Sequence, residues 1–91
     1  MSKIKIEKHL DKEELDRRGV FDWGIWEKEV SEFPWTYNGE EVCYLLEGKV
    51  EITPEAGETV IIEAGDFVIF PNGMNCYWKI TSAIKKHFNF N

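Results

Sequence analysis

The chain contains little cysteine and histidine, and it has no long apolar run. Its 91 residues include only Cys43, Cys76, His9 and His87 from these two residue types. The wide separation of the cysteines excludes a CxxC redox or zinc motif, and we expect reduced thiols. No stretch approaches the roughly 20 apolar residues of a membrane span, and the N-terminus lacks the apolar core of a signal peptide. We therefore expect a cytoplasmic protein without membrane contact.

Positive charge is also scarce. The sequence has 17 acidic and 11 basic residues and a formal net charge of −6. A nucleic-acid partner is not expected, because binding to a phosphate backbone relies on an excess of lysine and arginine. The apolar fraction is 43% and the aromatic fraction 14%, which is enough to close one compact core. Aromatic side chains are left over to line a cavity or a subunit contact.

One stretch near the N-terminus predicts a helix. Asp11 is a good N-cap, Glu14 follows three residues later as in a capping box, and Gly19 favours a stop. Leu10 and Leu15 are too few apolar positions for a bundle helix. We expect a flap that lies on a larger unit.

The rest of the chain predicts short antiparallel strands. Turns rich in Gly and Pro recur about every ten residues, a spacing typical of a β-barrel or sandwich. A tight turn is expected at Glu47–Gly48. The expected strands are 3–7, 41–46, 49–53, 59–63, 67–70, 76–80 and 83–90. The single domain, 1–91, is thus divided into a strand-and-helix flap, 1–22, and a barrel, 23–91.

A rigid corner is predicted between the strands at 67–70 and 76–80. Pro71 presets φ for the first corner position of a turn, and Asn72 or Gly73 is suited to the positive φ that follows. Because such a turn locks two strands together, it also holds Cys76 in a defined orientation.

Two motifs in this chain resemble those of the cupin superfamily. The first is the run EVCYLLEG from Glu41 to Gly48, and the second combines Gly65-Asp66 with Pro71-x-Gly73. More closely, the chain is similar to small single-domain cupins related to the domain of ureidoglycine aminohydrolase. The resemblance covers about residues 26–78. It implies an all-β fold, a small antiparallel jelly-roll β-barrel with one short N-terminal helix.

The same resemblance implies a metal site for which this chain lacks most ligands. Metal-bearing cupins offer a His-x-His pair, a glutamate four residues later and a histidine from the second motif. Counting from Glu41, the histidine positions hold Trp35, Tyr37 and Cys76. Because an indole cannot ligate and a phenol ligates mainly as phenolate, we expect no metal cofactor. The alternative is a divalent-metal site from Glu41, Cys76 and His87, in which the thiolate changes the metal preferred.

Aromatic residues lie in or beside both motifs, and two interpretations of them remain open. An apolar cavity with one carboxylate suits a small polar or cationic organic ligand. Alternatively, the rings simply fill the barrel. Strand alternation points Trp78 inward and Tyr44 away from the cavity, toward a partner subunit. The predicted ligand-binding residues are Trp35, Tyr37, Glu41, Phe70, Cys76 and Trp78.

Glu41 and Tyr37 are the candidate catalytic residues. Burial among rings and a thiol favours the protonated form of a carboxylate, the condition for general acid–base chemistry near neutrality. Tyr37 or Trp78 would then donate a hydrogen bond to the developing charge. The alternative for Glu41 is a solvated carboxylate beside Glu40. Cys76 is not expected to act as a nucleophile, because the sequence places no lysine or histidine beside it.

Three functions remain open. The first is a small-molecule-binding cupin of undefined specificity, with a pocket built on Glu41 and aromatics. The second is an enzyme that acts on small amide, ureide or amino-acid-like substrates through an atypical Glu/Cys/Tyr site. The third is a structural or regulatory protein with a filled barrel. A homodimer is expected, because the exposed strand edges of a small barrel need covering.

Overall fold

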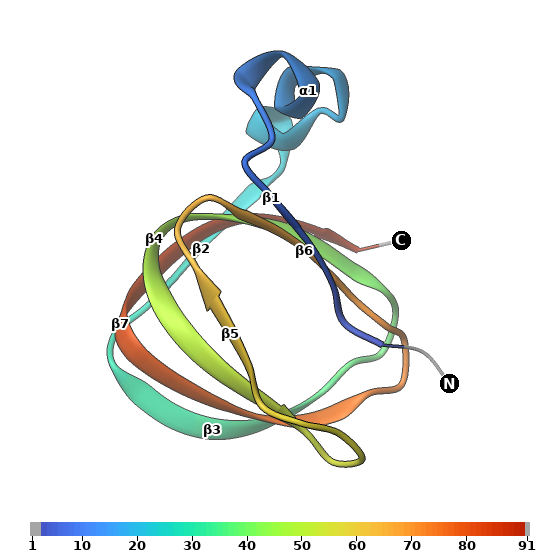
Figure 1. Ribbon diagram of the computed structural model, residues 1–91, viewed down its shortest axis with the longest axis vertical. Coiled ribbons are helices and arrows are strands. Elements are labelled where there is room, and N and C mark those ends of the chain that lie inside the picture. Colours follow the sequence, from blue (N-terminus) through green and yellow to red (C-terminus); the bar gives the residue numbers. More distant parts are fainter. Residues whose placement is uncertain (1–2, 91) are drawn as a thin grey trace.

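The computed structural model describes residues 3–90, which form one curled antiparallel sheet with a helical flap at one end (Figure 1). The flap contains α1 (Lys12–Arg17) and the 3-10 turn η1 (Val20–Asp22). The strands are β1 (Lys5–Lys8), β2 (Gly24–Lys28), β3 (Ser31–Thr36), β4 (Glu41–Pro54), β5 (Val60–Glu63), β6 (Asp66–Phe70) and β7 (Asn75–Phe90). The predicted all-β barrel with one short N-terminal helix is confirmed.

Two long strands, β4 and β7, form the middle of the sheet. The strand order is β1-β6-β4-β7-β2, with β3 also paired to β7 and β5 also paired to β4. The first part of β4 pairs with β6 and its later part with β5. In the same way, β7 pairs first with β3 and then with β2. Within residues 3–90, β1 and β2 do not pair with each other, so the barrel is open along one side.

The tight turn predicted at Glu47–Gly48 is wrong. The chain does not reverse direction at this dipeptide, which lies within β4. The register of β4 against β7 shifts there instead, as at a β-bulge. Gly48 has a φ of 97°, and a Cβ at this position would collide with the carbonyl oxygen of Ala83. Glycine is therefore needed here for close approach of two strands rather than for a hairpin. The two strands predicted at 76–80 and 83–90 likewise form one strand, β7.

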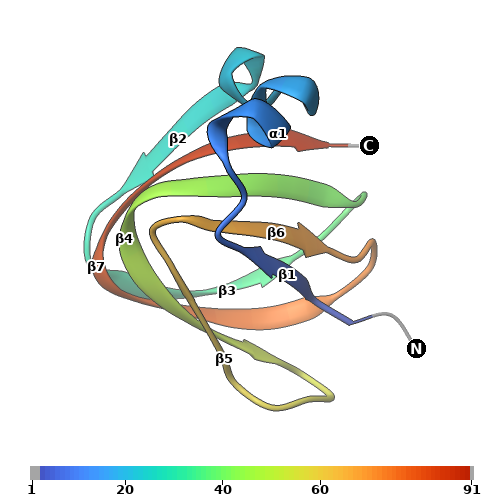
Figure 2. The same cartoon turned by 45° about the horizontal axis from the view of Figure 1, so that its top comes forward.

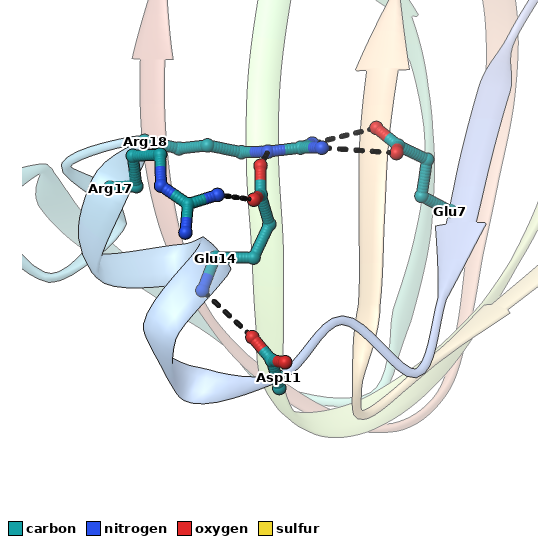
Figure 3. A network of polar contacts seen from close by, with 5 residues as sticks. All are labelled: Glu7, Asp11, Glu14, Arg17 and Arg18. Atoms are coloured by element: carbon teal, nitrogen blue, oxygen red, sulfur yellow. Dashed lines mark hydrogen bonds and ion pairs between the residues drawn. The ribbon is translucent and has the colours of Figure 1, made fainter.

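The flap is held by caps and ion pairs (Figure 3). Asp11 accepts a hydrogen bond from the Glu14 amide at 2.8 Å, so the predicted N-cap is confirmed. The Glu14 carboxylate does not complete a capping box, because it binds the guanidinium groups of Arg17 and Arg18 instead. Arg18 also donates two hydrogen bonds to Glu7 of β1, at 2.7 and 3.2 Å. These contacts tie the flap to the first strand of the sheet.

Buried apolar residues form two clusters on opposite faces of the sheet. The larger lies inside the barrel: Tyr37, Cys43, Leu45, Val50, Ile52, Ile62, Val68, Phe70, Cys76, Trp78, Ile80 and Ile84. The smaller lies between sheet and flap: Leu15, Val20, Val42 and Phe67. Tyr44 packs against this second cluster, with its ring centroid 6.5 Å from that of Phe21. The prediction that Tyr44 points away from the cavity is therefore confirmed, while a partner subunit beside it stays a prediction.

The flap lies over the end of the barrel where β2 begins and β7 ends (Figure 2). None of the helices within residues 3–90 is long and apolar enough to cross a membrane.

Candidate functional site

A cavity of about 210 Å³ opens into the barrel between β2, β3, β4 and β7. Four of its lining residues are buried: Tyr37, Glu41, Trp78 and Lys86. A cavity that keeps charged and polar groups at such depth differs from a core filled only by apolar packing. The aromatic residues therefore do not fill the barrel completely.

Aromatic rings form the walls and the mouth of the cavity. Trp26, Phe33 and Phe88 are half-buried wall residues. Trp35 and Phe90 also line it, with 47% and 46% of their surface exposed, so they mark the side that faces solvent. Flat apolar walls of this kind favour a ring or a short apolar group that lies between them.

A buried ion pair lies at the bottom of the cavity. Lys86 Nζ donates to Glu41 Oε2 at 2.7 Å, and the two side chains are only 5% and 4% exposed. The same ammonium lies 5.0 Å from the ring centroid of Trp26 and 4.8 Å from that of Trp78. The predicted carboxylate among aromatic rings thus has a partner that was not predicted, because Lys86 compensates its charge. The alternative of a solvated strand-end carboxylate is also wrong, since Glu41 is buried.

Lys86 is the functional residue that sequence reasoning missed. It lies directly opposite Trp26 in the β2–β7 pairing, and it lines the cavity together with Phe88, two residues further along β7. Counting every second residue from Trp78 places Lys86 on the inward face, but only if residues 78–86 form one continuous strand. Two consecutive lysines, Lys85 and Lys86, are more typical of a solvated surface, so the sequence gives no sign that Lys86 is buried.

Tyr37 is held by the predicted corner. Its amide donates to the Met74 carbonyl at 3.0 Å, and its carbonyl accepts from the Gly73 amide at 2.8 Å. Gly73 has a φ of 81°, as the turn prediction required. The Tyr37 ring stacks on Phe70, with centroids 4.9 Å apart. Backbone bonds and stacking together fix the direction of the phenol.

Two buried donors beside the cavity make no hydrogen bond of good geometry within residues 3–90, although the Glu41 carboxylate lies near the first and the Cys76 thiol near the second. The two donors are the Tyr37 hydroxyl and the Trp78 indole nitrogen. Burial raises the pKa of Tyr37, and the nearby charge of Glu41 raises it further, so the phenol remains a donor. Unpaired buried donors are uncommon in folded proteins and are a recognised sign of a missing partner.

The two thiols take no part in the cavity lining. Cys76 Sγ donates weakly to the Trp35 carbonyl at 3.6 Å, and burial raises the pKa of this thiol. Burial also raises the pKa of Cys43 to about 12. Of the six predicted ligand-binding residues, Trp35, Tyr37, Glu41 and Trp78 line the cavity. Phe70 and Cys76 belong to the core packed around it.

The alternative metal set of Glu41, Cys76 and His87 is not brought together. The His87 ring lies against the flap, with Nδ1 3.3 Å from the Trp23 carbonyl oxygen and its centroid 5.7 Å from that of Phe21. It follows Lys86 directly in an extended strand, so it faces the opposite side of the sheet. Between residues 3 and 90, no group of three or more His, Cys, Asp or Glu side chains is arranged to hold a metal ion. The residues present do not fit such a centre.

Comparison with known proteins supports one family. Residues 15–88 match the model of the EutQ-like cupin domain. A curated relative, acetate kinase EutQ of Escherichia coli strain K12, is 37% identical over 62 residues. The match covers 68% of this chain but only 26% of that relative, so this chain spans about a quarter of its length.

Two solved structures resemble the chain closely enough for comparison. A DUF861 family protein from Thermotoga maritima has 50% sequence identity and a TM-score of 0.94, with 98% of this chain and 100% of that one covered. A protein assigned as ethanolamine utilization protein Q from Salmonella typhimurium has 31% identity and a TM-score of 0.64. That match covers 71% of this chain and 52% of the Salmonella chain.

Proposed function

The chain belongs to the family of EutQ-like cupin domains, and from this premise we propose that it binds a small organic molecule in the cavity around Glu41 and Lys86. The predicted cupin fold is confirmed by this membership. The closer relation to ureidoglycine aminohydrolase stays a prediction.

The buried Glu41–Lys86 pair at the bottom of an open cavity is the observation that carries the proposal. Taking two charges out of water is costly, and a pair of well-packed apolar side chains is often at least as stable. An ion pair retained in the wall of a cavity is therefore better explained by recognition than by folding alone. The Tyr37 hydroxyl and the Trp78 indole N–H make no hydrogen bond of good geometry within residues 3–90, so both can donate to a ligand.

The size of the cavity limits the ligand. An apolar cavity of about 150 Å³ is large enough for benzene, and this cavity measures about 210 Å³. One ring with a small polar substituent, or an acyclic molecule of similar size, would fit. A structural protein with a filled barrel is disfavoured by the same volume.

An enzyme is a second candidate. Glu41 and Lys86 are 2.7 Å apart, a distance at which a proton is readily shared or passed. The predicted Glu/Cys/Tyr site would then become a Glu/Lys/Tyr site, because Cys76 lies outside the cavity lining. The activity named for the longer Escherichia coli relative concerns that whole protein, of which this chain matches only about a quarter.

A screen of single-ring and similarly small compounds by ligand-observed NMR tests the proposal. Hits are then titrated into the wild type and into Glu41→Gln, which keeps the shape of the side chain but removes its charge. Glu47→Gln is the matched control, because Glu47 is an exposed glutamate on the same strand. We expect Glu41→Gln to change the affinity at least about tenfold, with unchanged circular dichroism. Equal affinity in all three proteins, or no binder at all, would contradict the proposal.

A homodimer remains part of the proposal, as does a cytoplasmic location. Several large apolar side chains are 41–62% exposed: Phe21, Ile25, Val30, Trp35, Ile61, Tyr77 and Phe90. Light scattering after size exclusion measures the mass directly. A value near one chain, 10.7 kDa, at every concentration would exclude the dimer.

A further inference from the structure

We propose that Lys86 determines the ligand specificity of the cavity: its ammonium is a built-in cation, so the cavity accepts neutral ligands with a hydrogen-bond acceptor and rejects small cations. The inference rests on the proposed function, because it names the ligand class for the same cavity. It narrows the ligand expected from the sequence, which was polar or cationic.

The surroundings of the Lys86 ammonium are those of a cation-binding site. Two indole rings lie within 5.0 Å of it, and a carboxylate lies 2.7 Å away. Aromatic faces combined with an anion are the arrangement by which proteins recognise ammonium groups. In this protein the ammonium that occupies the site belongs to Lys86, a residue of β7. A free cation would have to displace Lys86, or lie beside it and compete for the single carboxylate of Glu41.

The charges at the bottom of the cavity balance. Lys86 contributes one positive charge and Glu41 one negative charge, while Tyr37 stays neutral. A cationic ligand meets the buried ammonium and an anionic ligand meets the buried carboxylate. In either case the like charge largely cancels the attraction of the opposite charge beside it, so little offsets the cost of taking the charge of the ligand out of water. A neutral ligand avoids this cost.

The polar groups left unpaired specify what the neutral ligand must carry. The Tyr37 hydroxyl and the Trp78 indole N–H can both donate, and neither makes a hydrogen bond of good geometry within residues 3–90. Lys86 adds ammonium hydrogens beyond the one directed to Glu41. The indole N–H and the ammonium can only donate, so a ligand that carries an acceptor such as a carbonyl oxygen satisfies them. The aromatic walls of the cavity suit an attached ring.

Three probes of nearly equal size and different charge test this specificity. They are acetophenone (neutral, with a carbonyl acceptor), benzoate (anionic) and benzylammonium (cationic), each titrated by NMR at pH 7. For the wild-type protein we expect acetophenone to bind, and the two charged probes to bind at least about tenfold more weakly.

Two variants should reverse the order of the probes. Lys86→Met removes the ammonium but keeps an unbranched side chain, which leaves the charge of Glu41 uncompensated. We expect benzylammonium to become the tightest probe for this variant. Glu41→Gln removes the anion instead, and we expect benzoate to gain affinity. Lys85→Met is the matched control, because Lys85 precedes Lys86 in β7 but does not line the cavity. It should leave the order of the probes unchanged.

The possible outcomes separate this inference from the proposed function. Wild-type affinity for benzylammonium equal to that for acetophenone would overturn the inference, and so would an unchanged order in folded Lys86→Met. In both cases the cavity still binds a small molecule and the proposed function stands. If Lys86→Met does not fold, the benzoate affinity of Glu41→Gln decides instead. If no probe binds the wild type or any folded variant, the inference and the proposed function both fail.

Discussion

Breaking the buried ion pair should destabilise the protein far more than its single hydrogen bond suggests. In Lys86→Met the Glu41 carboxylate stays buried, with a side chain 4% exposed, and loses its counter-charge. Solvent screening is slight at this exposure. Removing one partner of a buried pair typically costs about 3–5 kcal/mol, because an uncompensated charge is left in a medium of low dielectric. The lost contacts with two indole rings add to that cost.

Replacing both partners should cost much less than the sum of the single replacements. In the double variant Glu41→Leu/Lys86→Met no buried charge remains, and apolar replacement of a buried pair is often close to neutral. We therefore expect the two single variants to lose about 3 kcal/mol or more each. The coupling between them should be about 2 kcal/mol or more. For a domain of this length, 3 kcal/mol corresponds to a decrease in Tm of roughly 12–24 °C.

Urea unfolding followed by circular dichroism measures the stability of the wild type, the two single variants and the double variant, with Glu7→Gln as the exposed reference. Arg18 and Glu7 form an ion pair at a similar distance, 2.7 Å, but their side chains are 28% and 44% exposed. Solvent screens this pair, so its loss should cost no more than about 1 kcal/mol and less at high salt. If Lys86→Met proves no more costly than Glu7→Gln, or if the effects of the two single variants simply add in the double variant, the argument from burial is refuted.

Three further predictions concern the fold. Gly48→Ala should cost more than about 1 kcal/mol in urea unfolding, because φ is 97° and the new Cβ meets the Ala83 carbonyl; a wild-type midpoint would contradict the close approach of β4 and β7. Stability should fall as the pH rises from about 9 toward 12, by up to about 1.4 kcal/mol per pH unit, because the Cys43 thiol ionises near pH 9 when unfolded and only near 12 when buried. Cys43→Ala should flatten that decline, and an identical pH profile would exclude Cys43 as its source. Asp11→Ala should cost about 1 kcal/mol through loss of its bond to the Glu14 amide, and thermal unfolding that matches the wild type would show that the cap contributes nothing.

Local chemistry explains why much of the fold was predictable. Asp11 caps α1 through an amide three residues away, and Gly73 takes its positive φ inside a four-residue turn. These interactions depend only on neighbours in the sequence. Gly48 shows the limit of this approach. Glu-Gly is equally compatible with a tight turn and with a bulge, and only its contact with Ala83, far along the chain, favours the bulge.

The site was predictable only in part, for the same reason. Glu41, Tyr37, Trp35 and Trp78 were identified because they lie in or beside short motifs, and all four line the cavity. Lys86 was not, because nothing near it in the sequence marks it as buried.

The sequence by itself determined most of the strands, the helix cap, the corner at Pro71–Gly73 and four residues that line the cavity, since these follow from local backbone preferences, short motifs and strand alternation. Only the tertiary structure decided how the cavity is charged. The partner of Glu41 is 45 residues away, and whether β7 directs Lys86 or His87 inward depends on its register against β4 and β2. A shift of one residue would exchange the two side chains, and the register is set by packing across the whole barrel.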